Sequence, residues 1–229
     1  MRRGVKRVAG GEPVQYVLGQ TEFMGHVFKT DKRALIPRPE TEILVEAVLG
    51  CGALWAKEKP LIVDLGTGSG CIVISLALAR PEALYAALDV SAEAIELAKE
   101  NAASLAVGDR VSFLRAELPD VAEPQMADAI VSNPPYVATG AWEKLPAHIR
   151  EHEPRQALDG GPQGLDVLEN LIQDASIALK PGGHLFLEIG YDQGRAVAGM
   201  LAECQFSGIE VRKDLSGHDR IAVAGLALE

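Results

Sequence analysis

The stretch Asp64-Leu65-Gly66-Thr67-Gly68-Ser69-Gly70 decides the fold. It follows an apolar run, residues 61–65, that predicts a buried strand, and it leads into a segment, residues 69–80, that predicts a helix ended by Pro81. A glycine-rich turn at this place is typical of open α/β sheets, which bind ligands at the carboxyl ends of their strands. Its glycines let the backbone approach a ligand closely, and the carboxylate of Asp64 can engage a cationic or hydroxyl group.

The alternation of strands and helices continues to the end of the chain. Further strands are predicted at 84–89, 111–115, 127–132, 184–189, 209–212 and 220–224, and helices at 92–104, 166–179 and 193–203. This alternation indicates a parallel sheet with helices on both faces. Because only residues 215–219 join the last two strands, these should pair antiparallel. We therefore expect an α/β fold with a mostly parallel, seven-stranded sheet that ends in an antiparallel hairpin.

The first forty residues lack this regularity. Residues 1–20 are basic and punctuated by glycine, residues 21–36 have the pattern of a β-hairpin, and residues 41–56 predict one helix. We expect a basic, strand-rich segment, residues 1–40, that covers part of the ligand crevice, followed by one α/β domain, residues 41–229. Its basic side chains form either a solubilising, partly frayed start or a docking strip for an acidic or RNA-bound partner. They are Arg2, Arg3, Lys6, Arg7, Lys29, Lys32, Arg33 and Arg38.

Composition excludes several classes of protein. The net charge of −10 disfavours contact with a nucleic-acid backbone. No apolar run reaches the length of a membrane span, and no signal-peptide core follows the basic start, so we expect a cytoplasmic protein without a membrane partner. The three cysteines, Cys51, Cys71 and Cys204, are widely spaced and odd in number. We therefore expect reduced cysteines rather than a framework of disulfides or metal ligands. His148 and His152 are four apart but lack the glutamate of a zinc motif, so no metal site is expected.

Two further positions fit a nucleoside ligand. Asp89 closes a strand, where a carboxylate can bind both ribose hydroxyls, although it can equally be a neighbour of the helix cap Ser91. Beyond the next strand, Glu117 could accept from an adenine amino group while Leu118 lies against the ring; Glu117 can also be a solvated loop residue. The glycine spacing is neither that of dinucleotide folds nor that of phosphate loops, and the loop has no lysine.

The motif Asn133-Pro134-Pro135-Tyr136 follows the strand at 127–132 and should face the same crevice. Its prolines fix the backbone, the Asn133 amide oxygen and the Pro134 carbonyl are two acceptors, and Tyr136 offers a flat ring. A planar NH2 group requires such a site, because two acceptors fix its N–H bonds and the ring packs on its plane. Since an amide nitrogen is a poor nucleophile, positioning against an activated methyl must provide most of the acceleration. Alternatively, the NPPY motif is only a structural turn after the strand at 127–132.

The loop at 64–70, Asp89 and the NPPY motif together resemble the Rossmann-like (class I) methyltransferases. NPPY narrows the resemblance to enzymes that methylate planar nitrogens in DNA, in RNA or in glutamine side chains. Other segments resemble the peptide-chain release factor glutamine methyltransferases (the HemK or PrmC family). These segments are GEPVQY (11–16), LIPRPETE (35–42), ALDGGPQGL (157–165), LEIG (187–190), and Asp214-Leu215 with Asp219-Arg220.

The resemblance implies methylation of the glutamine amide nitrogen in the Gly-Gly-Gln motif of a release factor, the protein partner. The cofactor would be S-adenosylmethionine, with S-adenosylhomocysteine as product. The residues implied to bind it are Asp64, Gly66, Thr67, Gly68, Ser69, Gly70, Asp89, Glu117, Leu118 and Asn133. The glutamine would be bound by Asn133, Pro134, Pro135 and Tyr136, with Asn133, Pro134 and Tyr136 catalytic and no dedicated base. Family members usually carry a small helical domain before the GEPVQY segment, and this chain begins almost at that segment. We therefore expect either a truncated form or recognition of the release factor with less surface.

Two other functions remain open at this point. A DNA or RNA amino-nitrogen methyltransferase could use the same NPPY site, although the acidic charge and the absence of a target-recognition insert count against it. A non-catalytic, nucleoside-binding subunit is the second alternative, and the intact NPPY motif argues against it.

Overall fold

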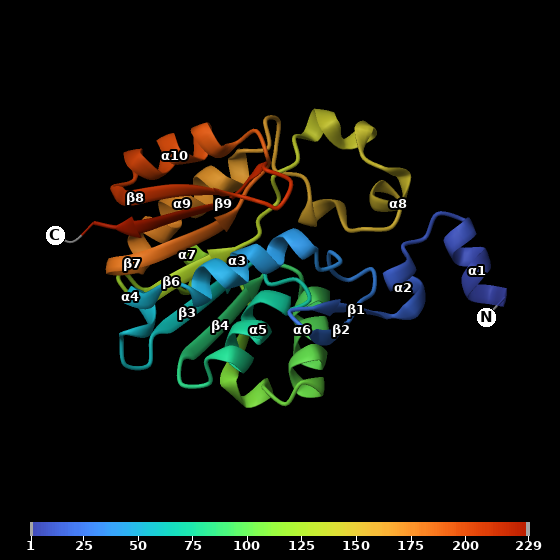
Figure 1. Cartoon of the computed structure of the whole chain (residues 1–229), viewed down its shortest axis with the longest axis horizontal. Helices are drawn as coiled ribbons and strands as arrows, with labels where there is room; N and C mark the ends of the chain where they lie inside the picture. Colours follow the sequence, from blue (N-terminus) through green and yellow to red (C-terminus); the bar gives the residue numbers. More distant parts are fainter. Residues whose placement is uncertain (1, 228–229) are drawn as a thin grey trace.

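The structure is a computed structural model, and it describes residues 2–227. Seven strands form the main sheet (Figure 1): β3 (Leu61–Leu65), β4 (Leu84–Asp89), β5 (Val111–Arg115), β6 (Ala127–Ser132), β7 (Leu179–Glu188), β8 (Phe206–Lys213) and β9 (Asp219–Leu226). Their order is β5-β4-β3-β6-β7-β9-β8. The first five pair parallel, and β9 pairs antiparallel with both β7 and β8. The predicted fold class, including the antiparallel pair at the end, is confirmed.

The chain reverses its direction across the sheet between β3 and β6. From β3 it proceeds outward to β4 and β5, then returns to β6 on the other side of β3. Leu65, near the end of β3, is in register with Leu88 on β4 and Ser132 on β6. The loops after these three strands therefore begin at the same level, and the crevice outside such a switch point is where open α/β sheets bind ligands.

Helices cover both faces of the sheet (Figure 1). One face carries α3 (Pro39–Leu49), α5 (Cys71–Ala79) and α6 (Ala92–Ser104), and the other carries α7 (Leu118–Val121), α9 (Asp166–Ala178) and α10 (Gly194–Glu203). Because side chains alternate along a strand, Ile62 joins the core under the first group and Val63 joins the core under the second. Both side chains are fully buried, and burial of each contributes about 1.5–3 kcal/mol.

The N-terminal segment contains two helices that the sequence did not predict. Helix α1 (Arg2–Ala9) and helix α2 (Val14–Leu18) replace the expected frayed, strand-rich start, and they lie at one end of the molecule, away from the sheet (Figure 1). Gly4, Val5 and Val8 are weak helix formers, so propensity argued against α1. Tertiary packing overrides it, since α1 packs on α2 so closely that a Cβ at Gly4 would lie 3.3 Å from Val17 Cγ1.

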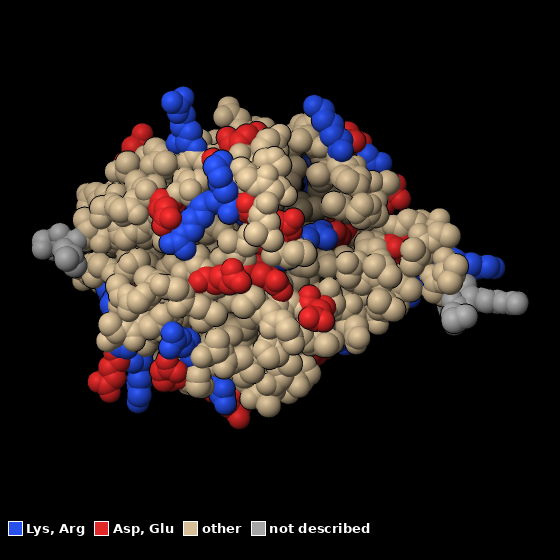
Figure 2. Space-filling view, in the orientation of Figure 1, with Lys and Arg blue, Asp and Glu red and all other residues tan. Residues whose placement is uncertain are grey.

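The rest of the segment agrees with the predicted hairpin. Strand β1 (Gln20–Phe23) pairs antiparallel with β2 (His26–Lys29), and the backbone N–H of Lys29 donates to Asn101 Oδ1 on α6 at 2.7 Å. Ion pairs join Arg7 to Glu12, Lys29 and Arg33 to Glu100, and Arg38 to Glu153. The side chains of Arg2 and Arg3, part of the suggested docking strip, lie outside the described residues. On the face of the molecule that Figure 2 shows, basic and acidic side chains are interspersed. The division of the chain at residues 40 and 41 stays a prediction.

Several element boundaries also differ from the prediction; the strand expected at 209–212, for example, extends over Phe206–Lys213. The helix expected over 41–56 is two helices. Helix α3 begins earlier, with Pro39 in its first turn, and ends at Leu49, and α4 (Gly52–Trp55) follows after Gly50 and Cys51. The strand expected at 184–189 starts earlier, since β7 begins at Leu179, which pairs with Ala127 ahead of a register shift. The long connection after β6 contains short helical turns: η2 (Thr139–Lys144), α8 (Ala147–Arg150) and η3 (Arg155–Ala157), with η1 (Gly108–Arg110) preceding β5.

Between residues 2 and 227, no helix is both long enough and apolar enough to cross a bilayer.

Candidate active site

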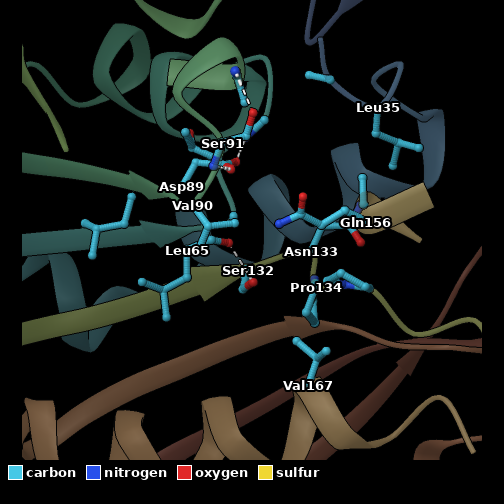
Figure 3. A pocket seen from close by; sticks show the side chains of 18 of the residues that line it. Leu35, Leu65, Asp89, Val90, Ser91, Ser132, Asn133, Pro134, Gln156 and Val167 are labelled. Carbon is cyan, nitrogen blue, oxygen red and sulfur yellow. Dashed lines mark hydrogen bonds between the residues drawn. The ribbon is translucent and has the colours of Figure 1, made fainter. Parts of the chain in front are cut away.

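A cavity of about 790 Å³ lies at the carboxyl ends of β3, β4 and β6. Figure 3 shows Asn133 and Pro134, from the end of β6, between Asp89 and Ser91 on one side and Leu35 and Gln156 on the other. The walls come from the glycine-rich loop, the ends of β4 and β6, residues 33–38, residues 154–159 and helix α9. A cavity of this size accommodates a ligand as large as a nucleoside derivative.

The glycines of the loop have two different tasks. Gly66 lines the cavity with a φ of +67°, and a Cβ built there meets no atom within 4 Å. Gly70 stands behind the cavity, where a Cβ would lie 2.8 Å from Ile74 Cδ1 and 3.1 Å from Ala98 Cβ. Gly66 therefore keeps the cavity open, whereas Gly70 lets α5 start in close contact with α6. Thr67, Gly68 and Ser69 also line the cavity.

Asp64 lies beneath the loop and is not among the residues that line the cavity. It is fully buried, and its Oδ2 accepts a hydrogen bond from the Thr67 hydroxyl at 2.7 Å. Burial raises the pKa of Asp64 to about 7. Its Oδ1 has no hydrogen-bond partner among the described residues. Asp64 thus holds the shape of the loop, and its direct contact with a ligand stays a prediction.

Asp89 lines the cavity and also accepts two backbone hydrogen bonds, whereas its contact with a ribose stays a prediction. Its Oδ2 accepts from the Gly68 backbone N–H and its Oδ1 from the Ser91 backbone N–H, each at 2.9 Å. Burial raises the pKa of Asp89, and these two bonds oppose that shift. A carboxylate has about four lone-pair sites, so two acceptors remain for hydroxyl groups in the cavity. Ser91 caps α6 as expected, with Oγ accepting from the Ala94 N–H at 3.2 Å.

Glu117 and Leu118 line the cavity at the start of α7. Leu118 is buried to 5% exposure and offers an apolar surface, while Glu117 is exposed. Helix α9 adds Asp174, which the sequence did not single out; burial raises its pKa, and the charge of Glu117 adds to the shift. This end of the cavity therefore offers one apolar surface beside two acceptors.

The NPPY motif divides between the cavity and the interior. Asn133, Pro134 and Pro135 line the cavity, and Tyr136 is not among its lining residues. The Tyr136 hydroxyl donates to Glu188 Oε1 at 3.2 Å, and burial raises the pKa of Tyr136. Packing of the Tyr136 ring on a substrate amide thus stays a prediction.

A buried hydrogen-bonded chain supports Asn133 from behind. Asn133 Nδ2 donates to Thr41 Oγ1 at 3.1 Å, and the Thr41 hydroxyl donates to Glu188 Oε2 at 2.6 Å. Burial raises the pKa of Glu188, whereas the Thr41 hydrogen bond, the charge of Arg220 and the Tyr136 hydrogen bond lower it. The sequence placed Thr41, Glu188 and Arg220 in motifs but gave them no role, because nothing in sequence spacing shows that these segments meet.

Residues 33–38 form one wall of the cavity, as expected for a segment that covers part of the crevice. Glu153, whose side chain is fully buried, holds this wall in place. It accepts from the Ile36 backbone N–H at 3.2 Å and forms an ion pair with Arg38. These contacts link residues 33–38 to the connection between β6 and α9, which contains Glu153.

The chain is similar to known proteins over nearly its whole length. The family model "Methyltransferase small domain" matches residues 41–159. The release factor glutamine methyltransferase of Neisseria gonorrhoeae is 45% identical over 223 residues, which cover 96% of this chain and 79% of that protein. The chain belongs to the release factor glutamine methyltransferase family. The family member from Moorella thermoacetica is 44% identical, over 97% of this chain and 78% of that protein.

Solved structures support the fold. The catalytic domain of hMettl16, in complex with the MAT2A 3'UTR hairpin 6, superposes with a TM-score of 0.71 over 94% of this chain and 81% of that chain, at 16% identity. A ribosomal protein L11 methylase from Lactobacillus delbrueckii has a TM-score of 0.56 over 85% of this chain and 81% of that chain, at 22% identity. At such identities the likeness concerns the fold alone, and it is that of class I methyltransferases.

Within the part of the chain that the structure describes, no group of three or more His, Cys, Asp or Glu side chains could hold a metal ion. His148 and His152 lie on and just after the short helix α8.

Proposed function

We propose that this protein transfers a methyl group from S-adenosylmethionine to the side-chain amide nitrogen of the glutamine in the Gly-Gly-Gln motif of a release factor, in the cytoplasm. One observation carries the proposal: Asn133 and Pro134 line the same cavity as Asp89 and the glycine-rich loop, and the hydrogen bond to Thr41 leaves the Asn133 amide oxygen free. Acceptors for a planar NH2 group and a site for a nucleoside thereby share one space.

The chemistry of the cavity fits the cofactor. Asp89 retains two acceptor sites for ribose hydroxyls, Leu118 offers an apolar surface for a base, and Glu117 offers an acceptor for its amino group. The open space at Gly66 leaves room for a close approach to the loop. When bound, S-adenosylmethionine supplies an electrophilic methyl group on a positively charged sulfur.

The chain's own residues perform the positioning. Asn133 Oδ1 and the Pro134 carbonyl accept hydrogen bonds from the two N–H groups of the substrate amide and so fix the plane of its nitrogen. Correct orientation of reacting groups can remove about 7–11 kcal/mol of a barrier, which matters for a nucleophile as weak as an amide. The proton leaves to water after methyl transfer, and no residue is assigned as a dedicated base.

The test is mass analysis of the Gly-Gly-Gln fragment of a release factor after incubation with the protein and S-adenosylmethionine. We expect one added methyl group on the glutamine, and none when that glutamine is replaced by alanine. DNA and RNA are assayed side by side. Methylation of a nucleic acid in place of the release factor would overturn the proposal.

A further inference from the structure

We infer that Thr41 and Glu188 are a positioning pair that sets which end of the Asn133 carboxamide faces the substrate. The inference rests on the proposed function, because it concerns the acceptor that holds the substrate amide. Glu188 is not among the residues that line the cavity, whereas Thr41 lines it beside Asn133. Because Thr41 gives its only hydroxyl hydrogen to Glu188 and accepts from Asn133, we assign the effect of the pair to Asn133.

The first step is a count of hydrogens. A threonine hydroxyl has a single hydrogen, and Thr41 gives it to Glu188 Oε2 at 2.6 Å. Towards Asn133, Thr41 can therefore only accept, and its neighbour at 3.1 Å must be the NH2 group of the carboxamide. The Asn133 Oδ1 consequently points away from Thr41 and remains free to accept.

The second step concerns Glu188, which can only accept while it is ionised. Its Oε1 takes the hydroxyl hydrogen of Tyr136 at 3.2 Å, and its Oε2 takes that of Thr41. Arg220 lies beside Tyr136, with its Nη1 3.5 Å from the Tyr136 hydroxyl and 3.2 Å from the Ile189 carbonyl. One carboxylate thus directs two hydroxyl groups at once and connects both ends of the NPPY motif.

The third step is rigidity. Thr41 is 2% exposed in the first turn of α3, and Glu188 is 1% exposed at the end of β7, where it pairs with Ile221. A buried chain of this kind, in which each donor has an acceptor, favours one arrangement over its alternatives. The orientation of Asn133 is therefore established before any substrate enters.

A reversed carboxamide would oppose the reaction. Its NH2 group would then face the NH2 group of the substrate, and two donors cannot bond to one another. Glu188→Gln permits that reversal, because the glutamine NH2 can donate to Thr41, whose hydroxyl is then free to donate to Asn133 Oδ1. Thr41→Val removes the partner of the carboxamide with little change in shape.

The experiment compares Thr41→Val, Thr41→Ser and Glu188→Gln with a matched control, Thr30→Val. Thr30 is also 2% exposed, and its hydroxyl donates to the Gln15 carbonyl at 3.2 Å outside the cavity. Two quantities are measured on folded protein: the single-turnover rate of methyl transfer, and the dissociation constant of S-adenosylhomocysteine by calorimetry. A third readout is hydrogen exchange of the Asn133 side-chain NH2 by NMR, assigned through its loss in Asn133→Asp.

We expect Thr41→Val and Glu188→Gln to lower the rate roughly 10–100-fold, with a far smaller change in affinity for S-adenosylhomocysteine. Exchange of the Asn133 NH2 should accelerate in Thr41→Val, while Thr41→Ser and Thr30→Val retain the wild-type rate. A wild-type rate and unchanged exchange in Thr41→Val would overturn the inference, as would an equal loss in Thr30→Val. If wild-type protein methylates no release factor, the proposed function fails, and the exchange measurement still tests the pair.

Discussion

The carboxylate of Asp89 accepts a hydrogen bond from the backbone N–H of Gly68 at 2.9 Å. This contact joins the end of β4 to the loop after β3, so the two segments that flank the cavity keep a fixed separation. The other carboxylate oxygen accepts from the Ser91 N–H, which leads into α6. Asp89 therefore organises the cavity and also presents acceptors to it.

Replacing Asp89 by alanine should weaken cofactor binding. The change removes the acceptors for ribose and releases the Gly68 N–H, and hydrogen bonds to charged groups contribute about 1.5–3 kcal/mol each. We expect the dissociation constant of S-adenosylhomocysteine, measured by calorimetry, to rise roughly 10–100-fold. Asp109→Asn, an exposed change in η1, is the control and should leave the affinity unchanged. Unaltered affinity in Asp89→Ala would contradict this role.

The two glycines Gly66 and Gly70 should respond differently to alanine. Gly70→Ala combines a positive φ with a Cβ only 2.8 Å from Ile74 Cδ1, so the free energy of unfolding should fall by about 2–4 kcal/mol. Gly66→Ala adds a methyl group to open space, so only backbone strain should lower the free energy of unfolding, by about 1 kcal/mol. Urea unfolding measures both losses, and calorimetry should show that Gly66→Ala mainly impairs binding of S-adenosylhomocysteine. Equal losses of stability would contradict the distinction.

The sequence predicted the sheet well, for a local reason. A central strand such as β3, with Ile62 and Val63 buried on opposite faces, is a short apolar run between turn residues, and this pattern is visible without tertiary information. The start of the chain was predicted poorly. Helix α1 contains Gly4 and forms against α2, a contact that no local pattern reveals.

The site was predictable where its residues follow strands directly. Asp89 and Asn133 line one cavity because parallel strands end at a common edge. The support for Asn133 was not predictable in this way. Thr41 lies 92 residues from Asn133 along the chain, and Glu188 lies 147 residues from Thr41, so only the folded structure brings them together.

Arg38→Ala should destabilise the protein by leaving a buried charge without its partner. The Glu153 side chain has no exposed surface, whereas 29% of the Arg38 side chain is exposed. Loss of one partner of a buried pair costs about 3–5 kcal/mol, and the partial exposure of Arg38 reduces the expectation to roughly 2–3 kcal/mol. Arg7→Ala breaks a matched arginine–glutamate pair at the surface and should have a far smaller effect in the same urea titration. Similar midpoints for the two variants would refute the prediction.

Asp64 should make stability depend on pH. Burial raises its pKa in the folded protein to about 7, whereas an unfolded aspartate titrates near 3.9, at about its reference value. Between these two values the folded state binds a proton that the unfolded state has released. The contribution of Asp64 to the free energy of unfolding is therefore fully present below about pH 4 and is lost as pH rises through about 7.

Asp64→Asn removes this titration and keeps an acceptor for the Thr67 hydroxyl. Urea unfolding at pH 5 and pH 8 should show a larger loss of stability in the wild type than in Asp64→Asn. Identical losses in the two proteins would show that Asp64 is already ionised throughout this range.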